Sequence, residues 1–577
     1  MDNFYKIIEN KMKDALVSCG YEVEEAQINE SNRPDLGEYQ YNGVMNLAKI
    51  YHKSPVSIAT EVVNVLKNDS TFSSISVAGP GFINMTLSNE FLINYINNVS
   101  FSYSKNDKLI FLDYGGANVA KSLHVGHLRS ANIGEALKRL CEFLGYNTIS
   151  DTHLGDFGRP LGLVILELSK RHPEWVYFDK NFNGEYPSEI ALTNKDLEEI
   201  YPYASMMAKE DENYLKEAQD MTKRLQNYEK GIYELWKKIM EISKRDIKNI
   251  YDRLNATFDL YKGESDAEKI VPEMLNYLDK LNVVVESEGA KVIPVSEEDD
   301  KLEIPPMLLI KSDGGILYST TELATIYDRM KEYSPDEIWY IVDKRQDLHF
   351  TQVFRAARKA NIIKGTTKLV FAGFGTMNGK DGKPFKTRDG GVMKLEDLLS
   401  LVKEESLKRL NSNIIDNRDS IAEDIAMSAV KYADMISSRE SDYIFDIEKF
   451  SSLEGKTGPF ILYSTIRMRS LLNKASEQGI KYEKISKINN LIDKDIYLKL
   501  NDFNKVLECS FNSKSLNDIT DYLYNLTTSY NRFYSENTVL KESDEELRES
   551  WLYLTKIVYD VNMKLLNILA INVPKVM

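Results

Sequence analysis

The sequence predicts a multidomain α/β protein with an additional all-α part, and three observations lead to this fold class. The chain has 577 residues, several times the usual length of one domain. Strand-like runs alternate with helical patterns through the middle of the chain. From about residue 396 onward the strand signals end, and the spacing of apolar residues is typical of helices.

The first segment, residues 1–105, is predicted to be a small α+β domain. It opens with an amphipathic helical stretch and closes on the run SISVAGPGFINMTL. The Gly-Pro-Gly break in this run precedes alternating residues, which is typical of a strand that follows a turn. We therefore expect a separate N-terminal domain.

Residues 106–400 are predicted to form a Rossmann-like parallel-sheet domain. The run LIFLDY at 109–114 indicates a buried strand, and a glycine-bearing turn and a helical pattern from about Gly126 to Leu144 follow it. Further strand-like runs, PPMLLI, EIWYIV and KLVFAGFG, occur between residues 305 and 375. Strands that alternate with helices favour a mostly parallel sheet.

Two long segments are predicted to be helical. Residues from about 165 to 265 form an expected helical insertion between the halves of the sheet, because apolar residues recur there at a spacing of three to five. These residues are Leu235, Ile239, Ile242, Ile247, Ile250 and Leu254. Residues 401–577 are expected to form a C-terminal helical bundle.

Composition limits the cellular setting. The formal net charge is −15, which does not exclude a nucleic-acid partner because phosphate recognition depends on local basic faces. Cys19, Cys141 and Cys509 lie far apart and form neither a metal-spaced pair nor a disulfide framework. No apolar run is long enough for a bilayer, and the N-terminus lacks an apolar signal core. We expect a soluble, cytoplasmic protein without structural zinc.

A His-x-Gly-His turn follows the first predicted strand. His124 and His127 lie three residues apart at the start of the predicted helix, so they share one face. Gly126 between them would let an adenine or a phosphate approach the backbone, and a helix start favours polyphosphates. Imidazoles there can donate hydrogen bonds during adenylyl transfer, and Lys121 could add a positive charge. The alternative is a pair of surface histidines at a loop–helix junction.

A cationic loop precedes the all-helical part. The run GKDGKPFKTRDGGVMKLEDLL at 379–399 places Lys383 and Lys386 among several glycines. Such a flexible loop can close over a triphosphate and stabilise departing pyrophosphate. The alternative is a solvated hairpin, which is common for this composition.

These segments carry a resemblance to a known family. The run His-Val-Gly-His resembles the HIGH signature of class I aminoacyl-tRNA synthetases. With Asn118-Val119-Ala120-Lys121 before it and THLGDFGRPLG at 152–162 after it, the string resembles the arginyl-tRNA synthetase family. Lys383-Pro384-Phe385-Lys386-Thr387 is similar to the KMSKS loop, with Lys386 at the second lysine, and departs from it at Pro384, Phe385 and Thr387.

The resemblance implies an arginine–tRNA ligase that converts ATP, with Mg²⁺, to AMP and pyrophosphate and uses no bound zinc. It implies tRNA(Arg) as the partner, required for arginine activation, and we expect a monomer. Catalytic candidates are His124, His127, Lys121 and Lys386, and ATP-binding candidates are His124, Gly126, His127, Lys383 and Lys386.

An arginine pocket needs carboxylates and neutral acceptors, because a guanidinium offers five donors and accepts nothing. Tyr318 and Glu322 lie four apart, so they share a face if a helix starts there. Glu322 stands where many relatives are expected to have aspartate. The residues that the resemblance points to as arginine-binding are Asp113, Asn118, His153, Tyr318, Glu322 and Gln346. For His153, a structural role is the alternative.

Two pairs of residues are candidates for tRNA contacts. The runs at 32–49 and 79–87 resemble the additional N-terminal domain of the family, where Phe82 could stack on a base and Asn84 could read its edge. The run at 454–472 resembles the anticodon-binding domain, where Tyr463 and Arg467 share a helical face. For Phe82, a place in a small core is the alternative.

Two other functions remain open at this point. One is another class I synthetase or a HIGH-type adenylyl transferase, which the acceptor-rich pocket disfavours. The other is a non-catalytic tRNA-binding paralogue, which would have no need to keep His124, His127 and Lys386.

Overall fold

The computed structural model describes residues 4–383, 385, 393–410 and 416–577, and these residues fall into two compact units. The first unit is built from residues 1–102, 463–509 and 521–565, and the second from residues 103–462, 510–520 and 566–577. Each unit therefore combines segments that are far apart in the sequence. The predicted domain boundaries after residues 105 and 400 stay a prediction.

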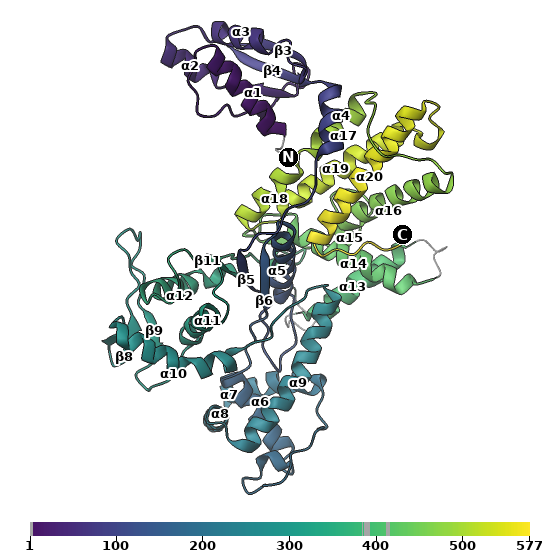
Figure 1. Ribbon diagram of the computed structural model, residues 1–577. Coiled ribbons are helices and arrows are strands. Elements are labelled where there is room, and N and C mark those ends of the chain that lie inside the picture. Colours follow the sequence, from purple (N-terminus) through teal and green to yellow (C-terminus); the bar gives the residue numbers. More distant parts are fainter. Residues whose placement is uncertain (1–3, 384, 386–392, 411–415) are drawn as a thin grey trace. The chain divides into compact units, whose positions relative to one another are not determined.

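A parallel sheet forms the centre of the second unit (Figure 1). Its strands lie in the order β11 (Lys368–Phe371), β10 (Glu337–Tyr340), β5 (Leu109–Asp113) and β6 (Asn147–Asp151), and each neighbouring pair is parallel. The predicted strands LIFLDY, EIWYIV and KLVFAGFG are confirmed in it, whereas β6 had not been predicted. Strand β6 reads NTISD, so it has too few apolar residues to be noticed as a buried strand.

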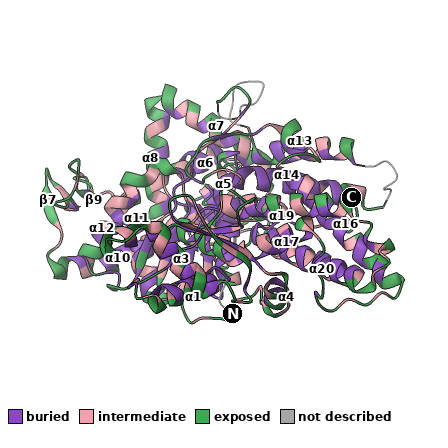
Figure 2. Ribbon diagram, turned by 90° about the horizontal axis from the view of Figure 1, so that it is seen from above, coloured by how far each residue is buried: buried purple, intermediate pink, exposed green. Residues whose placement is uncertain are grey.

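Helix α5 (Gly126–Phe143) packs against β5 and β6 and is buried along most of its length (Figure 2). The predicted helix from Gly126 is thus confirmed. A hydrophobic core joins Phe111 of β5 to the helices α10 (Glu264–Leu281), α11 (Tyr318–Glu332) and α12 (Asp347–Lys359). Val271, Leu323 and Phe350 are the contributions of these three helices.

The expectation that PPMLLI belongs to the parallel sheet is wrong. Strand β9 (Met307–Ile310) pairs with β8 (Ala290–Ile293), which pairs with β7 (Val285–Ser287), and both pairings are antiparallel. Glu288 and Gly289 join β7 to β8 with positive φ angles of 51° and 78°, as a tight hairpin requires. Strand β9 buries only alternate residues, whereas β5 is buried almost throughout. An alternating pattern belongs to an antiparallel sheet with one solvated face.

The predicted helical insertion is confirmed. It contains α6 (Arg159–Arg171), the short η1 (Val176–Phe178), α7 (Asn194–Glu210), α8 (Glu212–Gln226) and α9 (Lys230–Arg253). The six apolar residues that predicted it, from Leu235 to Leu254, are all at most 9% exposed. Together they form the face of α9 that covers the insertion's core.

The second unit continues into helices beyond the sheet. These are α13 (Leu395–Arg409), α14 (Arg418–Met435), α15 (Ile447–Phe450) and the start of α16 (Gly458–Glu477). A short strand, β13 (Tyr443–Ile444), pairs in parallel with β12 (Met377–Asn378). Strand structure therefore reappears after residue 396, in a pairing too short to leave a periodic signal.

The first unit combines an antiparallel sheet with helices. The sheet has the order β1 (Asn29–Glu30), β2 (Tyr39–Tyr41), β4 (Phe82–Leu87) and β3 (Phe72–Ala78). The helices are α1 (Phe4–Ser18), α2 (Val44–Tyr51), α3 (Pro55–Leu66), α4 (Asn89–Asn98), most of α16, α17 (Leu491–Leu500), part of α18 (Asp502–Ser513), most of α19 (Asn517–Glu536), η3 (Val539–Lys541) and most of α20 (Glu545–Ile568).

Polar contacts within the first unit join its N-terminal and C-terminal segments. The backbone N–H of Phe4 donates to Oδ1 of Asn501 at 3.1 Å, and Lys494 forms an ion pair with Glu38 at 2.5 Å. Among the described residues, no helix combines the length and the apolar character needed to cross a bilayer.

Candidate functional site

A cavity of about 460 Å³ opens in the second unit, beside the carboxyl ends of β5 and β10. This end of a parallel sheet is where such folds bind their ligands. Nine of the predicted site residues line it: Asp113, Asn118, His124, Gly126, His127, His153, Tyr318, Glu322 and Gln346. The structure thus brings together residues from well-separated segments, while their individual roles stay a prediction.

The two histidines of the turn lie against one another, with ring centroids 3.9 Å apart. The backbone N–H of His124 donates to Nδ1 of His127 at 3.0 Å, and the backbone N–H of Gly126 donates to Nδ1 of His124 at 3.0 Å. Nδ1 of His127 also lies 3.3 Å from the carbonyl oxygen of His124. In the tautomer in which each Nδ1 accepts, the proton of the neutral ring is on Nε2, and both side chains can donate a hydrogen bond from there.

The surroundings keep both rings neutral. Burial, with a smaller contribution from the neighbouring His124, lowers the pKa of His127 to about 3. Burial also lowers the pKa of His124, with a smaller contribution from Lys121. Neutral imidazoles that donate from Nε2 suit the stabilisation of charge on a phosphate during adenylyl transfer.

Gly126 is needed for a different reason from the one inferred from the sequence. A Cβ atom at this position would lie 2.8 Å from both Cε1 and Nδ1 of His124. The space above Gly126 is therefore filled by the His124 ring, not reserved for adenine or phosphate. The glycine allows His124 to fold back over the start of α5.

A buried ion pair anchors α5 just after the histidines. Nε of Arg129 lies 2.8 Å from Oδ1 of Asp434 on α14, and the side chains are 1% and 0% exposed. Arg129 also donates to the backbone carbonyl of Ser441 at 3.0 Å. Because both charges are paired and desolvated, this contact fixes where the start of α5 points.

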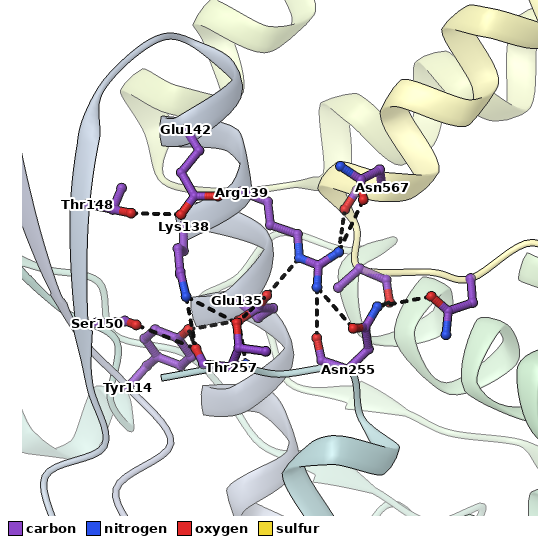
Figure 3. Close-up of polar contacts among 12 residues, drawn as sticks. Tyr114, Glu135, Lys138, Arg139, Glu142, Thr148, Ser150, Asn255, Thr257 and Asn567 are labelled. Atoms are coloured by element: carbon purple, nitrogen blue, oxygen red, sulfur yellow. Dashed lines mark hydrogen bonds and ion pairs between the residues drawn. The ribbon is translucent and has the colours of Figure 1, made fainter. Parts of the chain in front are cut away.

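A second polar network holds the middle of α5 (Figure 3). Glu135 accepts hydrogen bonds from the hydroxyl of Tyr114, from Arg139 and from the backbone N–H of Thr257. Arg139 also donates to Asn255 and to Asn567, so α5 is held by the segment after α9 and by the residues at the end of α20 that belong to this unit. These hydrogen bonds hold α5, whose first turn carries His127, in place within the second unit.

Asn118 is held beside the histidine turn by a glycine. The segment around Asn118 pairs with Gly155, since Val119 donates to the carbonyl of Gly155 and Gly155 donates to the carbonyl of Ala117. A Cβ atom on Gly155 would lie 2.3 Å from Oδ1 of Asn118. Gly155, within the run THLGDFGRPLG, therefore makes room for the Asn118 side chain at the cavity.

The start of α11 supplies the predicted acceptors. Tyr318 is the first residue of the helix and stacks on His349, with centroids 4.8 Å apart. Glu322 is one turn further and only 3% exposed, and its Oε2 has no hydrogen-bond partner among the described residues. Burial raises the pKa of Glu322, and His153 opposes this shift. A buried carboxylate oxygen without a partner is costly, so it is the natural place for a cationic ligand.

Several charged side chains lie close together at one end of the cavity. Ligand atoms of Asp113, Asp151 and His153 lie within 4.8 Å of one another, a grouping that could hold a cation. Arg329 occupies this corner, because its Nη2 donates to Asp113 at 2.6 Å and to Asp151 at 2.9 Å. Although burial lowers it, the pKa of His153 rises to about 9, because Asp151, whose Oδ2 lies 3.8 Å from Nδ1, and the carboxylates of Glu322 and Asp113 together favour the charged ring. The two aspartates are thus charge-balanced from within the protein.

Of the predicted lysines that the structure describes, neither Lys121 nor Lys383 lines the cavity. The ammonium of Lys121 lies 5.8 Å from the ring centroid of Tyr201 in the insertion. Lys383 is exposed in a turn in which Gly379 donates to its backbone carbonyl at 2.8 Å. Lys386 lies outside the described residues.

The predicted tRNA-binding residues belong to the first unit. Phe82 is half-buried, but Asn84 is 1% exposed and its Oδ1 accepts a hydrogen bond from Gln40 at 2.7 Å. In this arrangement Asn84 faces the core and not the surface. Tyr463 is 42% exposed, and the guanidinium of Arg467 lies 5.8 Å from its ring and 4.5 Å from that of Tyr534.

Several residues at the cavity had not been found from the sequence. Glu264 lines it from the start of α10, and Tyr340 from the end of β10. Burial raises the pKa of Glu264 to about 7. The signal for Tyr340 was its place at the carboxyl end of a predicted strand, whereas Glu264 and Arg329 gave no signal in the sequence beyond helix-forming residues.

The fold and the cavity together define the class of protein. A parallel sheet, a His-x-Gly-His turn at the start of the first crossover helix and a helical insertion are the parts of a class I aminoacyl-tRNA synthetase. In agreement, residues 92–447 match the family model for tRNA synthetases class I (R), catalytic domain. Residues 4–87 match the arginyl-tRNA synthetase N-terminal domain, and residues 461–577 match the DALR anticodon-binding domain.

Full-length relatives agree with these matches. The chain is 43% identical to an arginine–tRNA ligase of Alkaliphilus oremlandii and 42% identical to one of Agathobacter rectalis, with 100% of each chain covered in both cases. The chain belongs to the arginyl-tRNA synthetase family.

Solved structures share the fold. The arginyl-tRNA synthetase of Plasmodium falciparum superposes with a TM-score of 0.80 at 24% identity, and 100% of both chains is covered. The arginyl-tRNA synthetase of Thermus thermophilus gives a TM-score of 0.78 at 20% identity, with 99% of this chain and 100% of that chain covered.

Proposed function

We propose that the cavity beside β5, β10 and α11 is where this arginine–tRNA ligase joins arginine to AMP before transfer to tRNA. The observation that carries this assignment is the unpaired, buried Oε2 of Glu322 at the cavity. Arginine brings a planar, permanently charged donor to such an acceptor. Lysine has a single ammonium and cannot satisfy a planar set of acceptors, so the pocket rejects it.

The neutral polar groups orient the substrate around that contact. Tyr318 lies beside Glu322 on α11, and Asn118 and Gln346 line the same cavity from other segments. We assign Asn118 and Gln346 to the α-amino and carboxylate end of arginine, because they stand with the histidines in the lining. Fixing the carboxylate beside the α-phosphate converts a bimolecular step into an intramolecular one.

In the first step a carboxylate oxygen of arginine attacks the α-phosphorus of ATP. The bond between that phosphorus and the bridging oxygen breaks, and pyrophosphate leaves with the electron pair. The Nε2–H groups of His124 and His127 donate to the phosphate oxygens as charge develops. In the second step a terminal ribose hydroxyl of tRNA attacks the acyl carbonyl and AMP leaves, with no covalent bond to the enzyme.

The lysine loop is tied to the histidine turn at its far end. The backbone N–H of Val125 donates to the carbonyl of Met393, and the N–H of Leu395 donates to the carbonyl of Leu123. Met393 in turn donates to the carbonyl of Phe385, which directly precedes Lys386. These contacts support a role for Lys383 and Lys386 in holding the β- and γ-phosphates and the departing pyrophosphate.

Mg²⁺ enters as part of the ATP complex in this proposal. Asp113 and Asp151, the two carboxylates of the group that could hold a cation, are already paired with Arg329. A metal held mainly by phosphates and water therefore suits this chain better than a metal held by a protein cage. When bound, Mg²⁺ neutralises charge on the triphosphate.

We further propose that tRNA(Arg) is required for activation and that Tyr463 and Arg467 contact it. An exposed tyrosine beside a guanidinium offers stacking and a positive charge to an unpaired base. Phe82 and Asn84 are retained as candidates only for a tRNA-bound arrangement in which Asn84 becomes accessible. We also propose a cytoplasmic monomer, and the free state of Cys19, Cys141 and Cys509 supports the reducing compartment.

Arginine-dependent exchange of pyrophosphate into ATP tests the proposal. We expect exchange with arginine and cognate tRNA, near-background exchange without tRNA, and none with the other amino acids. Size-exclusion chromatography with light scattering checks the monomer. Preferred charging of another amino acid contradicts the assignment of the pocket, and full exchange without tRNA contradicts only the tRNA requirement.

A further inference from the structure

Arg329 is a fully buried arginine that lies beside the cavity. It stands on α11 seven residues after Glu322, which is two helical turns, so both side chains point to the same side of the helix. Its side chain is 1% exposed. The protein therefore keeps a guanidinium of its own next to the pocket for a substrate guanidinium.

The two partners of Arg329 are held side by side by the sheet. Asp113 and Asp151 are the last residues of the parallel strands β5 and β6 and face each other in register. Two carboxylates in such a site repel each other, and one guanidinium between them removes that repulsion. Although burial raises it, the pKa of Asp151 falls to about 2, because His153 and Arg329 favour its charged form.

Aromatic rings fix the orientation of the guanidinium. The ring of Phe111 lies 4.4 Å from the guanidinium carbon, and the ring of Tyr340 lies 5.5 Å from it. Such contacts favour a cation over the ring faces. Tyr340 and Asp113 line the cavity and both contact Arg329, whereas Arg329 itself does not line it.

The charges around Arg329 come from every element packed on it. They are Asp113 of β5, Asp151 of β6, His153 after β6, Glu322 of α11 and Tyr340 of β10, with Glu264 of α10 joining them through His153 and Glu322. Arg329 and His153 together offset Asp113 and Asp151. Glu322 is then the buried carboxylate left with an unpaired oxygen.

We propose that Arg329 is a positioning residue for amino-acid specificity, which neutralises Asp113 and Asp151 so that the pocket offers Glu322 to one cationic side chain. This rests on the proposed function of the cavity. Arg329 does not touch the substrate; it sets the charge that the substrate meets.

The test compares Arg329→Gln, which removes the charge, with Arg329→Lys, which keeps it. The matched control is Arg355→Gln. Arg355 lies on α12, forms an ion pair with Asp300 at 2.7 Å and does not line the cavity. For each variant, kcat and the KM for arginine are measured by pyrophosphate exchange with tRNA present, over a range from about pH 6 to about pH 9.

In Arg329→Gln the loss of the cation makes the pocket carboxylates harder to ionise. We expect the KM for arginine at neutral pH to rise about tenfold. The inflection in the plot of KM against pH should move up by about one pH unit. The kcat should change by less than about threefold, because the histidines are untouched. In Arg329→Lys and Arg355→Gln the inflection should stay in place.

If Arg329→Gln does not fold, Asp151→Asn provides a second test of the same proposal. Asp151 is buried and does not line the cavity, so its side chain does not contact the substrate directly. Losing this anion leaves excess positive charge, and the KM for arginine should rise about fivefold while the inflection moves to lower pH.

An unmoved inflection in Arg329→Gln overturns the role of Arg329, and so does an equal shift in Arg329→Lys. An unchanged KM in Asp151→Asn also overturns it. Failure of the wild-type protein to exchange with arginine contradicts the proposed function instead, so the two failures are distinguishable.

Discussion

Nδ1 of His127 lies 3.0 Å from the backbone nitrogen of His124 and 3.3 Å from its carbonyl oxygen. In the tautomer in which Nδ1 accepts the N–H of His124, the ring proton is on Nε2, where a ligand can accept it. Nδ1 of His124 accepts the N–H of Gly126 in the same way, so the two rings can act as a pair of donors.

Replacing His127 by alanine should reduce kcat by about 10²- to 10³-fold, because one donor to the transition state is lost. The KM for arginine should change little, since the Glu322 end of the cavity is intact. Steady-state pyrophosphate exchange measures both values. A variant with normal kcat would show that the histidine only shapes the turn.

The pH dependence follows from the neutral state of the same ring. Burial lowers the pKa of His127 to about 3, so the ring stays neutral as the pH is raised from that value. The ring becomes protonated only as the pH falls through about 3. We expect the kcat at saturating arginine to show no inflection from this ring near the ordinary imidazole value of about 6.5. An inflection there that His127→Ala abolishes would contradict this.

Gly126→Ala should separate activity from stability. The new Cβ would lie 2.8 Å from the His124 ring and displace it, so we expect kcat to fall about tenfold. The helix itself should tolerate alanine, which is favourable in helices by about 1 kcal/mol relative to glycine. Thermal unfolding and exchange kinetics are measured together. The control is Gly365→Ala, where a Cβ meets nothing within 4 Å; equal losses in both variants would oppose the steric explanation.

Glu322→Gln should raise the KM for arginine about 100-fold, because breaking a buried charged contact costs about 2–5 kcal/mol. The amide keeps the volume of the side chain but loses the negative charge and replaces one acceptor oxygen with a donor, whereas the guanidinium of arginine has only donors. Glu298→Gln, at an exposed position, serves as the control. Titration of arginine into each variant in the presence of tRNA supplies the comparison, and equal affinities would remove Glu322 from the pocket.

Asp434→Ala should destabilise the second unit by about 3–5 kcal/mol, because it leaves the buried charge of Arg129 unpaired. Glu273→Ala removes a surface partner of Lys331 and should cost only about 0–1 kcal/mol. Urea unfolding followed by tryptophan fluorescence gives the two values. Similar values for the two variants would mean that the buried pair does not hold α5.

The family and the strand–turn–helix around His124 could be predicted from the sequence alone, and so could most residues of the cavity lining that we assign to arginine. These features are local: periodicity, a glycine turn and ordered short motifs persist without knowledge of the fold. The helical face of α9 was predicted for the same reason. Nine of the predicted residues line one cavity.

Only the tertiary structure decided how those residues are supported. Arg329 and Glu264 look like ordinary helix residues in the sequence, and their importance comes from partners up to 216 positions away. The antiparallel position of β9, the burial of Asn84 and the reason for Gly126 also depend on long-range packing. Charge balance and steric fit are properties of neighbours in space, and a linear pattern does not specify those neighbours.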